Sequence, residues 1–300
     1  MTNAILRGKP DAGNPHVRFD EGEVASAKPR RGSLLYKKLL IVACAVCCVM
    51  VADAAKPAAK AVQEPTECVA QAKMDSRNAT PGRGDGPFGD YWWANRFLSR
   101  IEQVRAVKGQ TVDVVLMGDS IMHFWEWRHP QSWAKFTAGR KVLNCGYGGD
   151  RTQNVLWRIA HGELDGYEAK NVVLMIGTNN NTFKDTKPEN VAKAVEKIVS
   201  QIKVKQPKAK IILHPIFPRG NSAQSERHAS AKVRNDQTNV LLKQFADAHP
   251  EIAWIDFNAK MVDETGWVPK EIMADEIHPT DKGYEFWMEA LAPVLGSGTH

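Results

Sequence analysis

The sequence has few cysteines where a disulfide framework would need them. Cys44, Cys47 and Cys48 lie inside one apolar run, and only Cys68 and Cys145 lie outside it. A fold held together by several disulfides is therefore excluded. Two interpretations of the remaining pair stay open. One is a Cys68–Cys145 bridge, and the other, which we favour, is a buried thiol at Cys145 with a free thiol at Cys68 in a flexible segment.

Long hydrophobic runs are also scarce. The most apolar run covers residues 39–52, which is shorter than the roughly 20 residues that span a bilayer. It follows a basic stretch and precedes the small-x-small site Ala52-Asp53-Ala54, an order typical of a secretory signal peptide. We therefore predict that residues 1–54 are a signal peptide or an N-terminal membrane anchor, with the tether at residues 39–54. The protein is then expected to be secreted, periplasmic or attached to the cell envelope.

A large excess of one charge is absent from the rest of the chain. The formal net charge is +6, of which residues 1–38 contribute +4, Asp53 contributes −1 and residues 55–300 contribute +3. Basic residues form no stripe interleaved with aromatic ones, so nucleic acid is not expected as a partner. The histidines show no H-E-x-x-H or similar spacing, so we predict no metal site and no cofactor.

The remaining chain divides into a linker and one domain. Residues 55–85 are rich in Ala, Pro, Gly and charge, which predicts a flexible linker. In residues 86–300, short apolar runs rich in β-branched residues alternate with helical patterns, which predicts a flavodoxin-like three-layer α/β/α fold around a five-stranded parallel sheet. The expected strands are 112–117, 141–145, 171–176, 210–216 and 252–257, and the expected helices include 152–161, 188–205, 222–248 and 281–295.

Residues that could take part in catalysis follow four of these strands. Ser120 follows the first strand, Gly149 the second and Asn179 the third, while Asp275 and His278 follow the fifth. In open parallel sheets, ligands bind beyond the carboxyl ends of the strands, so these residues should meet at one rim. A hydroxyl, an amide, a close-approach glycine and a carboxylate–imidazole pair are the groups that acyl transfer needs.

Other motifs that could involve these residues do not fit. The glycine run 146–149 fails G-x-G-x-x-G because position 151 is Arg, and it lacks the G-K-[ST] ending of a phosphate loop. Ser120 fails the G-x-S-x-G elbow because Met122 stands where the last Gly should be. We interpret Asp119 as structural. Trp125, Trp127 and Arg219 are candidate pocket residues, with a solvated charge as the alternative for Arg219.

These blocks, in this order, resemble the GDSL/SGNH hydrolase family. Gly118-Asp119-Ser120 matches its nucleophile block, Gly149-Asp150 its glycine block, Gly177-Thr178-Asn179 its asparagine block and Asp275-x-x-His278 its acid–histidine block. The run G-Y-G-G-D-R-T-Q-N-V-L-W-R-I is most similar to the branch with the platelet-activating-factor acetylhydrolase Ib catalytic subunits and bacterial carbohydrate esterases.

The resemblance implies an SGNH hydrolase fold and a serine esterase. Ser120 would be the nucleophile and His278 its base, with Asp275 fixing the imidazole. The oxyanion hole would consist of the backbone N–H groups of Ser120 and Gly149 and the side-chain amide of Asn179. The expected reaction is hydrolysis of short, acetyl-type O-acyl esters, with a glycan or a small molecule as the substrate. Alternatives are a lysophospholipase- or thioesterase-type acylhydrolase and a non-catalytic ligand-binding module. Dimeric relatives leave a homodimer open.

Overall fold

The computed structural model describes residues 64–73 and 92–296, all of which lie in the compact unit Lys60–His300. The signal peptide or anchor predicted for residues 1–54 lies outside the described residues. Among the residues described, no helix is both long and apolar enough to cross a bilayer.

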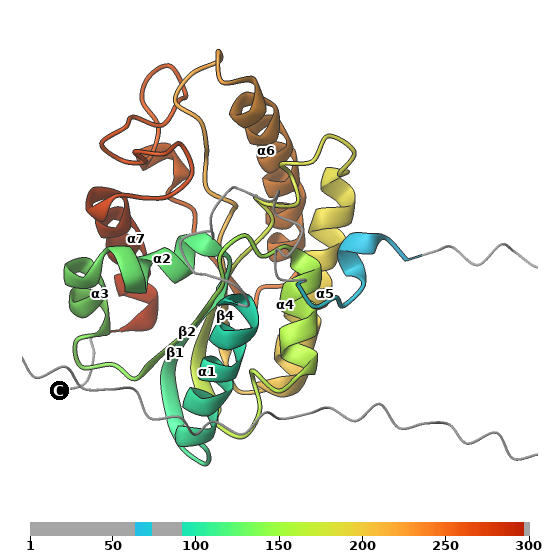
Figure 1. Cartoon of the computed structure of the whole chain (residues 1–300), viewed down its shortest axis with the longest axis vertical. Coiled ribbons are helices and arrows are strands. Elements are labelled where there is room, and N and C mark those ends of the chain that lie inside the picture. Colours follow the sequence, from blue (N-terminus) through green and yellow to red (C-terminus); the bar gives the residue numbers. More distant parts are fainter. Residues whose placement is uncertain (1–63, 74–91, 297–300) are drawn as a thin grey trace, which may run out of the picture. The chain divides into compact units, whose positions relative to one another are not determined.

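A five-stranded parallel sheet forms the centre of the unit (Figure 1). Its strand order is β2-β1-β3-β4-β5, which confirms the predicted flavodoxin-like α/β architecture. The strands are rich in Val, Ile and Leu because both faces of the sheet are covered. They are β1 (Thr111–Gly118), β2 (Val142–Gly146), β3 (Glu168–Met175), β4 (Lys210–Leu213) and β5 (Ile252–Trp254).

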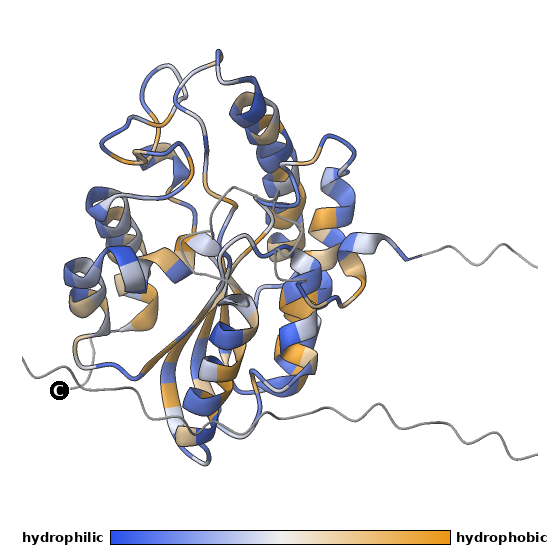
Figure 2. Cartoon of the chain, in the orientation of Figure 1, coloured by the Kyte–Doolittle hydropathy of each residue, from blue (hydrophilic) through white to orange (hydrophobic). Residues whose placement is uncertain are grey.

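Successive residues of β1 serve two separate hydrophobic cores, as the two-residue period of a strand requires. Met117 packs in the core that includes residues of α1, α4, α5 and α6, whereas Leu116 packs in the core shared with α2, α3 and α7. The helices therefore form two layers on opposite faces of the sheet. They are α1 (Trp92–Ala106), α2 (Ser120–Arg128), α3 (Pro130–Thr137), α4 (Thr152–Ala160), α5 (Pro188–Lys205), α6 (Glu226–Asp247) and α7 (Asp281–Leu295). Figure 2 shows apolar colours along the strands and mixed colours along the helices.

Several element boundaries differ from the sequence prediction for physical reasons. Strand β4 ends at Leu213, because Pro215 lacks the N–H that a further ladder bond would need. Helix α2 was not predicted, because residues 120–125 are all buried and such a helix has no polar face to give a helical period. Helix α6 begins at Glu226, four residues later than expected.

Residues 64–73, assigned to the linker from composition, pack instead on α4 and α5. The backbone oxygen of Glu67 accepts a 2.9 Å hydrogen bond from Thr152 Oγ1, and that of Gln71 accepts one of 3.0 Å from Asn154 Nδ2. Cys68, in the short helix Thr66–Cys68, is 1% exposed. Cys68 and Cys145 are both buried free thiols. The favoured interpretation of two unbridged thiols is therefore confirmed, but the placement of Cys68 in a flexible segment was wrong, because it packs against α4 and α5.

Candidate active site

The register of the sheet brings three predicted site segments to one edge. Gly118, the last residue of β1, pairs with Gly146 at the end of β2 and with Met175 at the end of β3. These three neighbouring strands end at the same level, so the chain segments that follow them begin side by side. Ser120 and Asn179 therefore start from the same edge of the sheet, as predicted.

Ser120, His278 and Asp275 form one hydrogen-bonded chain. His278 Nε2 lies 2.8 Å from Ser120 Oγ, and His278 Nδ1 lies 2.7 Å from Asp275 Oδ2. An ionised carboxylate can only accept, so Nδ1 carries the ring proton in the neutral imidazole and Nε2 accepts from the serine hydroxyl. Ser120 and His278 are 158 positions apart in the sequence, and the fold brings them into direct contact.

The loop that carries Asp275 and His278 is organised by the carboxylate itself. Asp275 Oδ1 accepts backbone N–H bonds from Ile277, at 3.2 Å, and from His278, at 2.8 Å. Burial alone would raise the pKa of Asp275. The hydrogen bond and charge of His278, together with these backbone donors, outweigh burial and hold the pKa of Asp275 well below its usual range. The carboxylate therefore stays ionised while it orients the imidazole.

The His278 ring is also held from one face. The ring of Phe124, on α2, lies 4.6 Å from the His278 ring, measured between centroids. The guanidinium of Arg128, one turn further along α2, lies 3.7 Å from the centre of the Phe124 ring. Helix α2 thus supplies both the serine at its first residue and the aromatic surface against which the histidine packs.

Asp119 caps the helix that presents Ser120. Its side chain accepts a 3.0 Å hydrogen bond from the backbone N–H of Ile121, which satisfies one of the open donors at the start of α2. Burial raises the pKa of Asp119 to about 7, against the opposing effect of this hydrogen bond. This placement agrees with a structural role for Asp119.

Gly149 and Asn179, the two other predicted oxyanion residues, lie together beyond β2 and β3. Gly149 has a positive φ of 66°, a conformation that side chains disfavour. A Cβ atom there would lie 2.6 Å from Lys73 Nζ. Asn179 Nδ2 donates a 2.9 Å hydrogen bond to the backbone oxygen of Asp150. This bond fixes the amide and uses one of its two N–H groups.

A buried charge network, which sequence reasoning missed, supports the same strand ends. Arg158 of α4 is fully buried and forms ion pairs with Asp150, at 3.0 Å, and with Glu163. Tyr147 donates a 2.6 Å hydrogen bond to Glu163, and Trp93 donates one of 2.7 Å to Asp150. Burial raises the pKa of Asp150 to about 6 despite the Arg158 charge. The available sequence signal was an arginine on the apolar face of the predicted helix 152–161.

The three candidate pocket residues have different places. Trp125 is fully buried and donates a 2.7 Å hydrogen bond to Ser132 Oγ, so it is a core residue and its assignment to the pocket was wrong. Arg219 is 2% exposed and donates to Thr178 and Thr182 on the loop that carries Asn179, which excludes a solvated charge. Burial lowers its pKa to about 10. Trp127 is 50% exposed.

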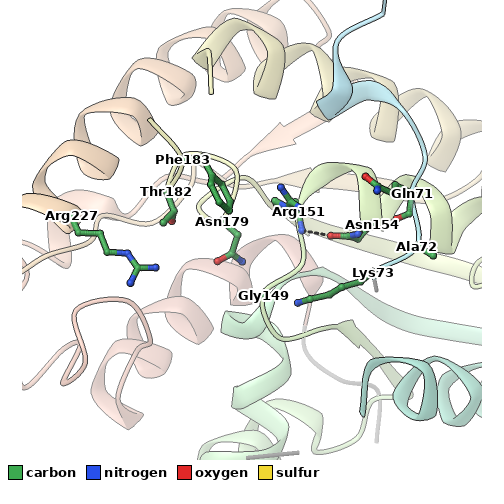
Figure 3. A pocket seen from close by; sticks show the side chains of 10 residues that line it. All are labelled: Gln71, Ala72, Lys73, Gly149, Arg151, Asn154, Asn179, Thr182, Phe183 and Arg227. Carbon is green, nitrogen blue, oxygen red and sulfur yellow. Dashed lines mark hydrogen bonds between the residues drawn. The ribbon is translucent and has the colours of Figure 1, made fainter. Parts of the chain in front are cut away.

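A cavity of about 370 Å³ adjoins this site, and Gly149 and Asn179 form part of its wall. Figure 3 shows its side chains. They come from segment 64–73, from the start of α4, from the loop after β3 and from α6. The lining residues are Gln71, Ala72, Lys73, Gly149, Arg151, Asn154, Asn179, Thr182, Phe183 and Arg227. Within residues 64–73 and 92–296, no three His, Cys, Asp or Glu side chains gather in a group that could hold a metal ion.

An α/β sheet with a Ser–His–Asp chain at its carboxyl edge is an arrangement that acyl-transfer enzymes use. The model of the GDSL-like Lipase/Acylhydrolase family matches residues 116–286. The chain belongs to this family, and the matched range includes Ser120, Asn179, Asp275 and His278. The resemblance drawn from the sequence blocks is therefore confirmed.

Mammalian relatives and a bacterial structure extend the match. Platelet-activating factor acetylhydrolase IB subunit alpha2 of Homo sapiens is 33% identical over 209 residues, which cover 69% of this chain and 84% of that protein. Subunit alpha1 of Homo sapiens is 30% identical over 188 residues, which cover 63% and 77%. The structure of a GDSL-like lipase from Bacteroides thetaiotaomicron superposes with a TM-score of 0.54 at 20% identity, covering 68% of this chain and 95% of that one. That last likeness shows the shared fold.

Proposed function

We propose that the protein is an exported serine esterase that hydrolyses short, acetyl-type O-acyl esters on a carbohydrate. The observation that carries the proposal is the 2.8 Å contact between His278 Nε2 and Ser120 Oγ, with Asp275 on the other ring nitrogen. A serine hydroxyl becomes an effective nucleophile when a base accepts its proton during attack. The family of this chain consists of acylhydrolases, and the relatives at 33% identity carry the name acetylhydrolase.

The proposed reaction has two steps. Ser120 Oγ attacks the ester carbonyl carbon as its proton moves to His278 Nε2, and the resulting oxyanion accepts hydrogen bonds from Ser120 N, Gly149 N and Asn179 Nδ2. The carbon–alkoxy bond then breaks, and the alcohol leaves with the proton from His278. Water attacks the acyl-serine by the same route, gives a proton to His278 and releases the carboxylic acid as Ser120 regains its hydrogen.

Hydrolysis of p-nitrophenyl acetate, butyrate and octanoate tests this proposal. The full chain is compared with Ser120→Ala and with a control, Ser200→Ala, which removes an exposed serine on α5. We expect acetate cleavage that depends on Ser120 but not on Ser200 and falls steeply toward octanoate. Covalent labelling by a fluorophosphonate should likewise need Ser120.

Two other outcomes favour the alternatives. Efficient octanoate cleavage would indicate a lysophospholipase- or thioesterase-type acylhydrolase, which the similarity to enzymes named for platelet-activating factor also supports. Absence of both Ser120-dependent turnover and fluorophosphonate labelling would overturn the esterase proposal and leave a ligand-binding module.

Export is part of the proposal and rests on the apolar run at residues 39–52, which follows a basic stretch. Fractionation of expressing cells tests it, with the deletion of residues 39–52 as the matched control. We expect the intact chain outside the cytoplasm and the deletion variant inside it. The same location for both proteins would remove export from the proposal while leaving the chemistry untouched.

A further inference from the structure

All the charged side chains that the structure describes in the wall of the cavity beside Gly149 and Asn179 are basic. Of the residues described, its wall includes Lys73, Arg151 and Arg227 and no aspartate or glutamate. These cations come from three separate parts of the chain, namely segment 64–73, the residue before α4 and the first turn of α6. In Figure 3 the Arg227 side chain extends toward Asn179 and that of Lys73 extends toward Gly149. Like charges gathered in a cavity repel one another, so an anion placed there would lower the free energy of the site.

Two of the cations have no acidic partner in the described part of the chain. Among the residues that the structure describes, neither Arg151 nor Arg227 forms an ion pair, and Arg151 instead lies with its guanidinium 5.2 Å from the centre of the Phe183 ring. Phe183 is 55% exposed in the same wall. The cavity thus combines guanidinium groups that lack an ion pair with an exposed aromatic ring. This combination suits a sugar ring that carries an anionic oxygen group.

Two backbone donors at the start of α4 are already bonded within the protein. The N–H of Arg151 already donates to Asn154 Oδ1 at 2.9 Å, and that of Thr152 donates to Asn180 Oδ1 at 3.0 Å. We therefore assign recognition of an anion in the cavity chiefly to the side-chain cations.

Lys73 joins the cavity to the proposed oxyanion site. Its Nζ donates a 2.6 Å hydrogen bond to the backbone oxygen of Gly148 and lies 2.6 Å from the position that a Gly149 Cβ would occupy. The lysine comes from a segment outside the family-matched range 116–286. Bonds from Thr152 and Asn154 hold that segment in place.

We propose that this cavity binds an oxyanion, a carboxylate or a phosphate, on the alcohol part of the substrate. The preferred substrates are then acetylated anionic sugars, such as an O-acetylated uronate or sugar phosphate, rather than neutral ones. This inference rests on the proposed esterase function, because it assigns the cavity to a substrate whose carbonyl lies at Gly149 and Asn179.

The kinetic test compares three esters acetylated at the same hydroxyl, namely those of methyl glucoside, glucuronate and glucose 6-phosphate. With the full chain, we expect kcat/KM to be at least about tenfold higher for an anionic ester than for the neutral one, the effect of one charge-assisted hydrogen bond. Arg227→Gln and Arg151→Gln should each reduce this ratio by about tenfold. Arg105→Gln, an exposed arginine at the end of α1, should leave it unchanged.

The two anions distinguish the source of the oxyanion. A higher rate for the uronate assigns a carboxylate, and a higher rate for the phosphate ester assigns a phosphate. Equal kcat/KM values for all three esters would overturn the inference, and so would Arg227→Gln and Arg151→Gln variants that keep the parent ratio.

A binding measurement separates this inference from the proposed function. Calorimetric titration of the Ser120→Ala full chain with glucuronate, glucose 6-phosphate and glucose needs no turnover. We expect at least one anion to bind about tenfold more tightly than glucose and to lose that advantage in the Ser120→Ala, Arg227→Gln double variant. Equal binding of all three sugars refutes the anion site even in an active esterase, whereas selective anion binding in a chain without Ser120-dependent hydrolysis refutes only the esterase.

Discussion

The guanidinium of Arg158 donates a 3.2 Å hydrogen bond to the backbone oxygen of Gly118. Gly118 is the last residue of β1 and stands two positions before Ser120. The same guanidinium pairs with the buried carboxylates of Asp150 and Glu163. One charged group of α4 therefore links the segment that presents the serine to the segment that follows Gly149.

Removal of Arg158 should destabilise the fold strongly. Arg158→Met leaves the Asp150 and Glu163 carboxylates buried without their counter-charge, a change that typically costs about 3–5 kcal/mol in the free energy of unfolding. Urea unfolding at neutral pH measures the loss. The control is Lys208→Met, which breaks the exposed Lys208–Glu168 pair and should cost less than about 1 kcal/mol. A loss of unfolding free energy for Arg158→Met as small as that for Lys208→Met would show that the network contributes little to stability.

Asp275→Asn should abolish most of the catalysis and leave the fold intact. Asparagine retains an oxygen for the N–H groups of Ile277 and His278, but its NH₂ cannot accept the proton of His278 Nδ1. The imidazole then favours the tautomer that cannot take the serine proton, and we expect kcat to fall by about 10³–10⁴. Steady-state hydrolysis of p-nitrophenyl acetate measures kcat, and a thermal melt checks the fold. A fall of less than tenfold in a well-folded variant would contradict the role of Asp275.

Asn179→Ala tests the oxyanion assignment. Loss of one preorganised donor typically lowers kcat by about 10²–10³, while KM should change little because the donor acts on the transition state. The variant also loses the 2.9 Å bond to the Asp150 carbonyl, which should cost about 1 kcal/mol of stability. Kinetics and urea unfolding of the same preparation separate the two effects. An unchanged kcat, with the stability loss present, would leave Asn179 a structural residue only.

Asp119 should make stability depend on pH between about 4 and 7. Burial raises its pKa in the folded protein to about 7, above the value of about 3.9 in an unfolded chain. The unfolded chain therefore loses this proton at lower pH than the folded protein. The associated stability is complete below about pH 4 and is lost as pH rises to about 7, a change on the order of 4 kcal/mol.

Asp119→Asn removes that proton exchange and keeps an oxygen for the Ile121 N–H. Relative to the parent, the variant should gain stability between pH 4.5 and pH 8, as urea unfolding at the two pH values measures. Asp185→Asn, at an exposed position after Asn179, should show no such gain. A parent–variant difference that is the same at both pH values would mean that Asp119 stays ionised throughout.

The strands and the central site residues could be predicted because their signals are local. Short β-branched runs predict buried parallel strands, and the residues that follow such strands must meet at one edge of the sheet. Ser120, Asp275 and His278 each occur in a short block directly after a strand or in the final loop. Helix α5, with Pro188 at its first position, matched its predicted bounds of 188–205 because proline at that position marks a helix start.

Other features depended on contacts between distant residues and left no local signal. Composition assigned residues 64–73 to a linker, yet Thr152 and Asn154 of α4 bind that segment's backbone. Trp125 was interpreted as a pocket residue because it lies near the serine, but its side chain is fully buried in the hydrophobic core formed with α3 and α7.

The sequence by itself determined the class of fold and the chemical groups at its edge, since strand period, glycine placement and side-chain type are local properties. Tertiary structure alone decided which groups touch. It set the 2.8 Å contact of Ser120 with His278, the burial of Arg158 between two carboxylates, and the arrival of Lys73 beside Gly149. Hydrogen bonds and ion pairs act over a few ångströms, so their partners are fixed only when packing brings distant parts of the chain to that separation.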